Sequence, residues 1–359
     1  MFPILLCSTN SGKHQENATF LHSSLKGLFL ILFLLVLFSL PYILSIRFVG
    51  VFTIMAILVV ATVGLQITTG YAGQVNLGQS AFMGMGAYTT ASLASHFGFP
   101  LWITIPIGGG GAAILGAIFG LPALRIKGFY LALTTIAAQT LFPIIIVRAP
   151  KKWFGGPIGI DVEPGKFFGI TINTETTLYY LVIITTVIMV YAAFNLMKCR
   201  VGRAFVAIRE NEIVAEIMGI NVYWYKTLSF LVGAFYAGIA GGLWAYYFRY
   251  LMVDQFTLWF SIWYLGMLIV GGMGSILGAI LGTVLIRALQ EMITYLGPYL
   301  TKLFPGLGES IWFMGMNILL GGIIILFLIF EPKGLVHRWN LLVTSRIWPF
   351  RISKIREGD

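Results

Sequence analysis

The sequence predicts an all-α polytopic membrane protein, and three features of its composition support that prediction. Of its 359 residues, 58% are hydrophobic and only 10% are charged. The apolar residues gather in runs of about 20, the length of a helix that crosses a hydrocarbon core of about 30 Å. The 42 glycines suit the same class, because small residues let membrane helices approach one another closely.

We expect about ten membrane-spanning helices within a transmembrane domain at residues 27–335. The apolar runs place them, in chain order, at about 27–45, 48–68, 78–96, 101–123, 129–149, 175–196, 227–247, 257–271, 273–291 and 309–330. The third run is glycine-rich and semipolar. The eighth and ninth could be two short spans, or one span and a re-entrant segment.

The distribution of positive charge sets the orientation of these helices. Lys and Arg are retained on the cytoplasmic side of a membrane, and an N-terminus inside places most of them there. Both termini are therefore expected in the cytoplasm, with residues 1–26 as an N-terminal segment and 336–359 as a basic tail. A charged loop at about 199–226 then lies inside, and the longest loop, 150–174, lies outside. An anionic inner leaflet explains the net charge of +10 without a nucleic acid partner.

The inner loop contains a charged stretch, FVAIRENEIVAEIMGIN, at residues 205–221. Its apolar residues recur at helical spacing, so we expect one helix from about Val201 to Met218, with Gly219 as a helix stop. That helix has an apolar face and a charged face, and it lies outside the membrane. It could be a solvated connecting helix, or it could dock on the protein's own inner surface or on a partner.

A second unusual stretch, TGYAGQVNLGQSAFMGMGAYTTA, covers residues 69–91. Polar backbone and amide side chains are costly in lipid unless protein or a water-filled path surrounds them. Gln74, Asn76 and Gln79 are therefore candidates for residues of a translocation path or gate. In the alternative, the stretch is a cytoplasmic turn followed by a helix that Asn76 caps.

Small residues repeat every four positions in two further runs. Gly116 and Gly120 belong to the first run, and the second contains Gly274, Gly278 and Gly282. Such faces of small residues predict close packing between helices. They could also slide against each other between inward-open and outward-open states.

Three stretches of the chain together resemble one known family. The chain is similar to the permease subunits of branched-chain amino acid ABC importers, of the LivM type within the LivH/LivM permease family. The resemblance lies in residues 69–91, in GRAFVAIRENEIVAEIMGINVYWYKTLSFLVGAFYAGIAGGLWA at 202–245 and in GGMGSILGAILG at 271–282. It extends from about residue 48 to 335, so it leaves out the N-terminal segment and the tail after about 340.

The resemblance implies an ABC importer permease fold with a coupling helix, at roughly 203–221, that docks on an ATPase subunit. Gly202 and Gly219 would set the ends of this helix. The charged residues would make polar contacts and the isoleucines packing contacts. The residues to which the resemblance assigns this coupling are Arg203, Arg209, Glu210, Glu212, Ile213, Ile217 and Gly219.

The resemblance also implies partners. They are a second permease subunit of the LivH type, two ABC ATPase subunits and an extracytoplasmic solute-binding protein, assembled at the bacterial inner membrane. The implied substrates are leucine, isoleucine and valine. Urea and short amides, which the same class of permease serves, are the alternative.

No catalytic, metal or cofactor site is expected in this chain. A P-loop needs Gly-x-x-x-x-Gly-Lys-Ser/Thr, and neither Gly-Lys pair, at 12–13 or 165–166, is followed by Ser or Thr. ATP is therefore expected on partner subunits. A self-contained secondary transporter is a second hypothesis, although no Asp or Glu lies in the middle of an expected span. An integral membrane enzyme is a third, but it would need clustered polar groups that the sequence does not show.

Overall fold

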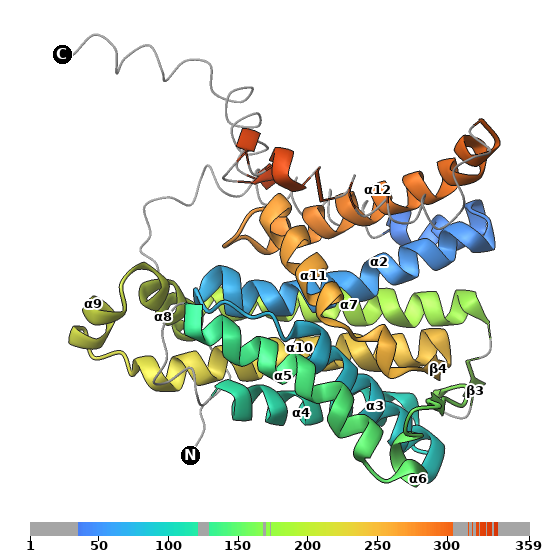
Figure 1. The fold of residues 1–359 in the computed structure, drawn as a ribbon, viewed down its shortest axis with the longest axis horizontal. Coiled ribbons are helices and arrows are strands. Elements are labelled where there is room, and N and C mark those ends of the chain that lie inside the picture. Colours follow the sequence, from blue (N-terminus) through green and yellow to red (C-terminus); the bar gives the residue numbers. More distant parts are fainter. Residues whose placement is uncertain are drawn as a thin grey trace.

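The computed structural model describes residues 35–120, 129–167, 170–172 and 174–303, together with scattered positions between 315 and 336. Helices dominate this part of the chain (Figure 1). They are α2 (Ile46–Leu65), the π-helix η1 (Gln66–Tyr71), α3 (Gln79–Phe97), α4 (Leu101–Gly120), α5 (Phe129–Arg148), α6 (Lys151–Phe154), α7 (Glu175–Lys198), α8 (Arg200–Glu210), α9 (Glu212–Ile217), α10 (Val222–Phe248), the 3-10 helix η3 (Val253–Gln255), α11 (Leu258–Gly271) and α12 (Ile276–Leu303).

The structure confirms an all-α polytopic membrane protein. Among the described residues, seven helices are long and apolar enough to cross a membrane: Ile46–Tyr71, Leu101–Gly120, Tyr130–Arg148, Glu175–Lys198, Val222–Phe248, Val253–Gly271 and Ile276–Tyr295. The semipolar third run also forms a helix, α3, of 19 residues. The second half of the first expected span is described and is helical at residues 35–43. The N-terminal segment and the start of that span, most of the tenth expected span and the basic tail lie outside the described residues, so a total of about ten spans stays a prediction.

The ambiguous pair around 257–291 is two separate helices. Helix α11 ends at Gly271, and a turn with left-handed backbone at Gly274 (φ 88°) leads into α12. Helix α12 has 28 residues and is longer than the sequence suggested. Helices α11 and α12 pack against each other across this turn, and each belongs to a segment long and apolar enough to cross a membrane.

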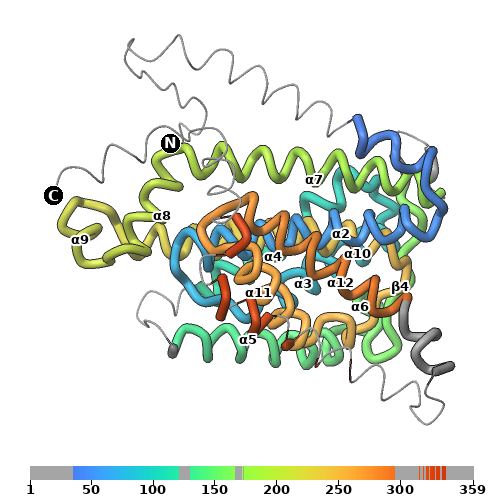
Figure 2. The backbone as a smooth tube through the Cα atoms, turned by 90° about the horizontal axis from the view of Figure 1, so that it is seen from above, coloured from blue at the N-terminus to red at the C-terminus, as the bar shows by residue number. Residues whose placement is uncertain are grey.

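Helix α10 and helix α2 form the centre of the bundle. The long helices run in one general direction, and α10 packs against α4, α3 and α2 (Figure 2). Helix α2 in turn packs against α7 and α12. Helices α5, α7 and α12 lie at the periphery and leave large apolar side chains exposed, as helices that face lipid or a partner helix require.

Glycines allow the closest of these helix contacts. A Cβ on Gly116 would overlap the Cβ of Ala234 on α10, and one on Gly120 would lie 3.1 Å from the Cβ of Phe230. Gly278 and Gly282 lie in the same way against the end of α11. Gly274 departs from the expected repeat: it lies in the turn before α12, because its left-handed backbone cannot continue a helix.

Opposite ends of the bundle carry different accessory structure. Helices α8 and α9 project at one end, while α6 and the short strands lie at the other (Figure 1). Strand β1 (Ile160–Asp161) pairs antiparallel with β4 (Tyr250–Leu251), and β2 (Lys166–Phe167) pairs with β3 (Ile170–Thr171). The loop at 150–174 is thereby tied to the chain that follows α10.

Candidate functional site

The charged stretch forms two helices, where one was expected. Helix α8 ends at Glu210, and Asn211 has an extended backbone (φ −158°, ψ 110°) that no helix can accommodate. The Asn211 side-chain oxygen accepts hydrogen bonds from the N–H groups of Ile213 (3.0 Å) and Val214 (3.2 Å). Asparagine competes well as an N-cap, so this residue begins a new helix, α9, instead of continuing the old one.

Helices α8 and α9 and the start of α10 share a small apolar core of their own. Ile208, Ala215 and Val222 are buried together, one from each helix. Gly219, with φ 83°, ends α9 as expected, and Asn221 caps α10 by accepting the N–H of Trp224 at 3.1 Å. Gly202 does not mark a helix end: it lies within α8, tightly against Met197 of α7. We call α8, α9 and the turns beside them, residues 200–221, the cytoplasmic unit, after the side of the membrane on which the distribution of Lys and Arg predicts it.

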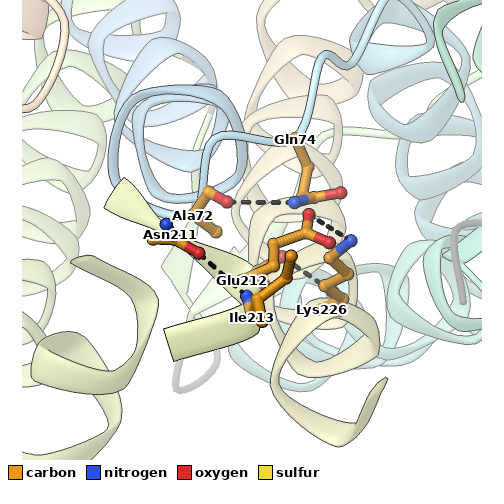
Figure 3. Close-up of polar contacts among 7 residues, drawn as sticks. Ala72, Gln74, Asn211, Glu212, Ile213 and Lys226 are labelled. Carbon is orange, nitrogen blue, oxygen red and sulfur yellow. Dashed lines mark hydrogen bonds and ion pairs between the residues drawn. The ribbon is translucent and has the colours of Figure 1, made fainter. Parts of the chain in front are cut away.

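An ion pair ties the cytoplasmic unit to the bundle. Lys226 Nζ lies 2.5 Å from Glu212 Oε1 (Figure 3), and the Lys226 side chain is only 3% exposed. Glu212 is the first residue of α9, where the partial positive charge of the helix terminus also favours a carboxylate. The pair fixes α9 against α10.

The Arg209 side chain makes a second link. It leaves α8, passes Gly73 and donates a hydrogen bond from Nη1 to the carbonyl oxygen of Gly70, at 2.5 Å. A Cβ on Gly73 would lie 3.1 Å from Arg209 Cγ, and one on Gly274 would lie 2.6 Å from Arg209 Nη1. Two glycines with left-handed backbone therefore leave the space that this side chain occupies.

The remaining residues expected to couple to an ATPase face outward. Arg203 and Glu210 are exposed. Ile213 and Ile217 are 65% and 79% exposed, and their neighbours Val214 and Met218 are exposed as well. An open groove of about 360 Å³ separates the Ala72–Gln74 segment from residues 208–213 of the cytoplasmic unit.

The three amides at 74–79 lie inside the protein. Gln74 lines the groove and donates to the Ala72 carbonyl at 3.0 Å (Figure 3). Asn76 accepts the N–H of Gly78 at 2.9 Å and donates to Gln79 at 3.0 Å. Gln79 donates to the Ala61 carbonyl at 2.7 Å. Gln74 and Asn76 thus satisfy backbone groups of the non-helical segment 72–78, which lipid would leave unpaired, and Gln79 ties the start of α3 to α2.

Sequence reasoning missed several polar residues that hold this region. Gln139 of α5 accepts the N–H of Ala81 at 2.8 Å, and Ser261 of α11 accepts the N–H of Ser80 at 2.9 Å, so both cap the start of α3. Gln66 donates to the carbonyls of Gly272 and Ser275. The sequence does contain a signal for Gln66 and Gln139: each is an amide inside an apolar run, and such a side chain needs a polar partner within the protein.

The site contains no reactive constellation among its described side chains; its interactions are structural. Two polar links, through Arg209 and through Glu212, join an exposed helical unit to three membrane elements: η1, the turn before α12 and α10. The exposed isoleucines provide an apolar surface on the opposite side of that unit. This arrangement suits the transmission of movement between a partner and the membrane helices.

The chain is similar to several known permease proteins. The permease protein LivM of the high-affinity branched-chain amino acid transport system of Escherichia coli (strain K12) is 28% identical over 335 residues, which is 87% of this chain and 75% of that protein. A probable branched-chain amino acid transport permease protein LivM of Methanocaldococcus jannaschii is 27% identical over 227 residues, 62% of this chain and 64% of that protein. A probable LivH permease of the same organism is 24% identical over 291 residues, covering 78% and 88%.

No solved structure matches the chain. The family model described as the permease component of the branched-chain amino acid transport system matches residues 47–328. That range includes almost all of the seven candidate spans and the whole cytoplasmic unit. The chain therefore belongs to the family of branched-chain amino acid transport system permease components.

Proposed function

We propose that this chain is the LivM-type permease subunit of an ABC importer and forms part of the path by which branched-chain amino acids cross the bacterial inner membrane. The observation that carries the proposal is the family match over residues 47–328, supported by LivM relatives along most of the chain. The seven apolar helices make it a multi-pass membrane protein. A role in urea or amide transport, or as a self-contained carrier, has no comparable support.

The proposal includes partners. A LivH-type subunit would complete the path, since LivH and LivM permeases both resemble this chain. Two ABC ATPase subunits would hydrolyse ATP, and an extracytoplasmic binding protein would deliver leucine, isoleucine or valine. This chain would then bind no nucleotide or other cofactor itself.

We place ATPase docking on the cytoplasmic unit. Ile213 and Ile217 would pack against the ATPase, because exposed apolar side chains on a charged helix mark a protein contact. Arg203 and Glu210, which are exposed on α8, would supply polar contacts. Arg209 and Glu212 would keep the unit in register with the bundle, and Gly219 would end α9 at the length that docking needs.

We place the translocation path beside residues 72–78. Gln74, Asn76 and Gln79 would border it by holding this non-helical segment in shape, which their hydrogen bonds support. Non-helical backbone at membrane depth is tolerated where it is buried in protein or lines a water-filled cavity. A small movement of this segment would then be enough to open or close the path.

Purification from native membranes in mild detergent tests the proposal. We expect a second permease and nucleotide-hydrolysing subunits to co-purify, and the complex to take up labelled leucine in proteoliposomes when ATP and the binding protein are supplied. Unlabelled isoleucine and valine should compete, while urea should not. A chain that purifies alone and transports without ATP would contradict the proposal in favour of a carrier.

A further inference from the structure

The cytoplasmic unit meets the membrane helices at a small polar junction. We use the name Arg209 junction for Arg209, Gly70, Gly73, Gly274 and Gln66. Helix α8 lies beside η1 at this end of the bundle, with the α11–α12 turn close by (Figure 1). The junction joins three segments that are far apart in the sequence.

Two sets of hydrogen bonds meet at the Arg209 junction, and a close packing contact between Gly70 and Gln66 joins them. Arg209 donates to the Gly70 carbonyl at the end of η1. The Gln66 side chain lies directly against Gly70, where a Cβ would come within 2.7 Å of its Cδ. Gln66 then donates to the carbonyls of Gly272 (3.2 Å) and Ser275 (3.0 Å) in the α11–α12 turn. A displacement of α8 therefore acts on both η1 and this turn.

The element that receives this contact is a π-helix. The N–H of Ala72 donates to the carbonyl of Ile67, five residues earlier, at 3.1 Å. Such wide turns are rare and are frequently found at functional sites. The non-helical segment 72–78 follows at once, so a shift in η1 would move that segment as well.

We propose that Arg209 is the positioning residue that transmits movement of the cytoplasmic unit to η1 and to the α11–α12 turn. This inference rests on the proposed function, because it takes ATPase docking on α9 as the source of the movement. It assigns Arg209 a role within this chain: the residue is exposed along the groove, but its guanidinium donates to Gly70 and lies beside Gly73 and Gly274, while the apolar surface of α9 stays available for the ATPase.

The experiment compares the reconstituted complex with and without an intact junction. Arg209→Gln removes the charge and shortens the side chain, and Arg209→Lys keeps a donor for the Gly70 carbonyl. Gly274→Ala crowds the same contact from the other side, since its Cβ would lie 2.6 Å from Arg209 Nη1, and it also strains the turn, because Gly274 has φ 88°. Arg200→Gln, at an exposed position at the start of the same helix, is the matched control.

Three quantities are measured in proteoliposomes: the ATPase content of the complex, the rate of ATP hydrolysis and leucine uptake driven by the binding protein. We expect Arg209→Gln and Gly274→Ala to assemble normally and to hydrolyse ATP, while leucine taken up per ATP falls roughly three- to thirtyfold. Arg209→Lys should recover part of the loss, and Arg200→Gln should match the wild type. A merely structural defect would lower assembly and leave the uptake per ATP of the surviving complex unchanged.

Two outcomes would overturn the inference. One is unchanged uptake per ATP in Arg209→Gln. The other is loss of the ATPase subunits from that variant, which would make Arg209 a direct docking residue. Failure of the wild-type complex to take up leucine would instead contradict the proposed function, so the two failures are distinguishable.

Discussion

Lys226 lies in the second turn of α10 with its ammonium group almost fully buried against Glu212. Removing water from a charge is costly, and the pair compensates only because the two groups are in direct contact. Each partner therefore depends on the other. Loss of one leaves a buried charge unpaired, and that is more harmful than loss of both.

The residue-scale prediction concerns this pair. Glu212→Gln should destabilise the permease by about 2 kcal/mol, below the usual range for a fully buried pair because Glu212 is 26% exposed. The thermal unfolding midpoint in detergent measures the effect. Glu210→Gln, at the exposed neighbour, is the control and should change little. The double variant Glu212→Gln/Lys226→Met should recover stability. Equal unfolding midpoints for Glu212→Gln and Glu210→Gln would contradict the importance of the pair.

At the scale of elements, α9 combines a fixed position with an unpartnered surface. Asn211 caps it, Glu212 ties it to α10 and Ala215 buries its inner side. On its outer side, Ile213 and Ile217 are exposed. A short helix held so firmly can offer this apolar surface at little entropic cost, since its backbone is already ordered.

Ile217→Ser tests that surface. We expect normal expression and folding, because the side chain is 79% exposed, and a clear loss of co-purified ATPase. The control is Ile158→Ser, which is 77% exposed at the opposite end of the bundle and should leave the ATPase bound. Equal retention of ATPase in both variants would rule out docking at Ile217.

Helices α4 and α10 provide a second element-scale prediction. Gly116→Ala would force the two backbones apart, because its Cβ would overlap that of Ala234, and should cost about 1–3 kcal/mol. Gly110→Ala, in the same helix with no atom within 4 Å of its Cβ, should be neutral or stabilise by up to about 1 kcal/mol. Thermal unfolding of the two variants decides; similar shifts would contradict close packing at Gly116.

For the whole molecule, burial falls from the centre of the bundle to its edge. The span that contains α2 is 78% buried inside the protein and α10 is 72% buried, whereas α7 is 28% buried. Helices α2 and α10 therefore hold the fold together. The peripheral helices leave large apolar side chains exposed, as helices that face lipid or a partner helix require.

Truncating one isoleucine in each region tests this arrangement. Ile57→Ala, in the centre of α2, should leave a cavity and cost about 2–4 kcal/mol. Ile188→Ala, on α7 with 59% exposure, should cost far less, because lipid or detergent fills the space. The measurement is thermal unfolding of each purified variant. A large loss at Ile188 would show that a closely packed partner covers that face.

Much of the fold followed from local sequence patterns. Apolar runs located α2, α4, α5, α7 and α10 to within a few residues, since any segment that crosses lipid must be long, apolar and helical. The resemblance led to the family. The break at Asn211 was missed, although its cap chemistry is local, because the apolar periodicity continues across it.

The sequence could not predict which groups the polar side chains contact. The sequence indicates no partner within the chain for Arg209 or Glu212. The structure pairs Arg209 with Gly70, 139 positions earlier, and Glu212 with Lys226, 14 positions later. Gln139 and Ser261 cap α3 from helices that no pattern places beside it. The sequence by itself determined the membrane class, most spans and the family, because burial in lipid imposes composition residue by residue. Only the tertiary structure decided which polar groups meet, because such contacts depend on how helices distant in sequence pack together.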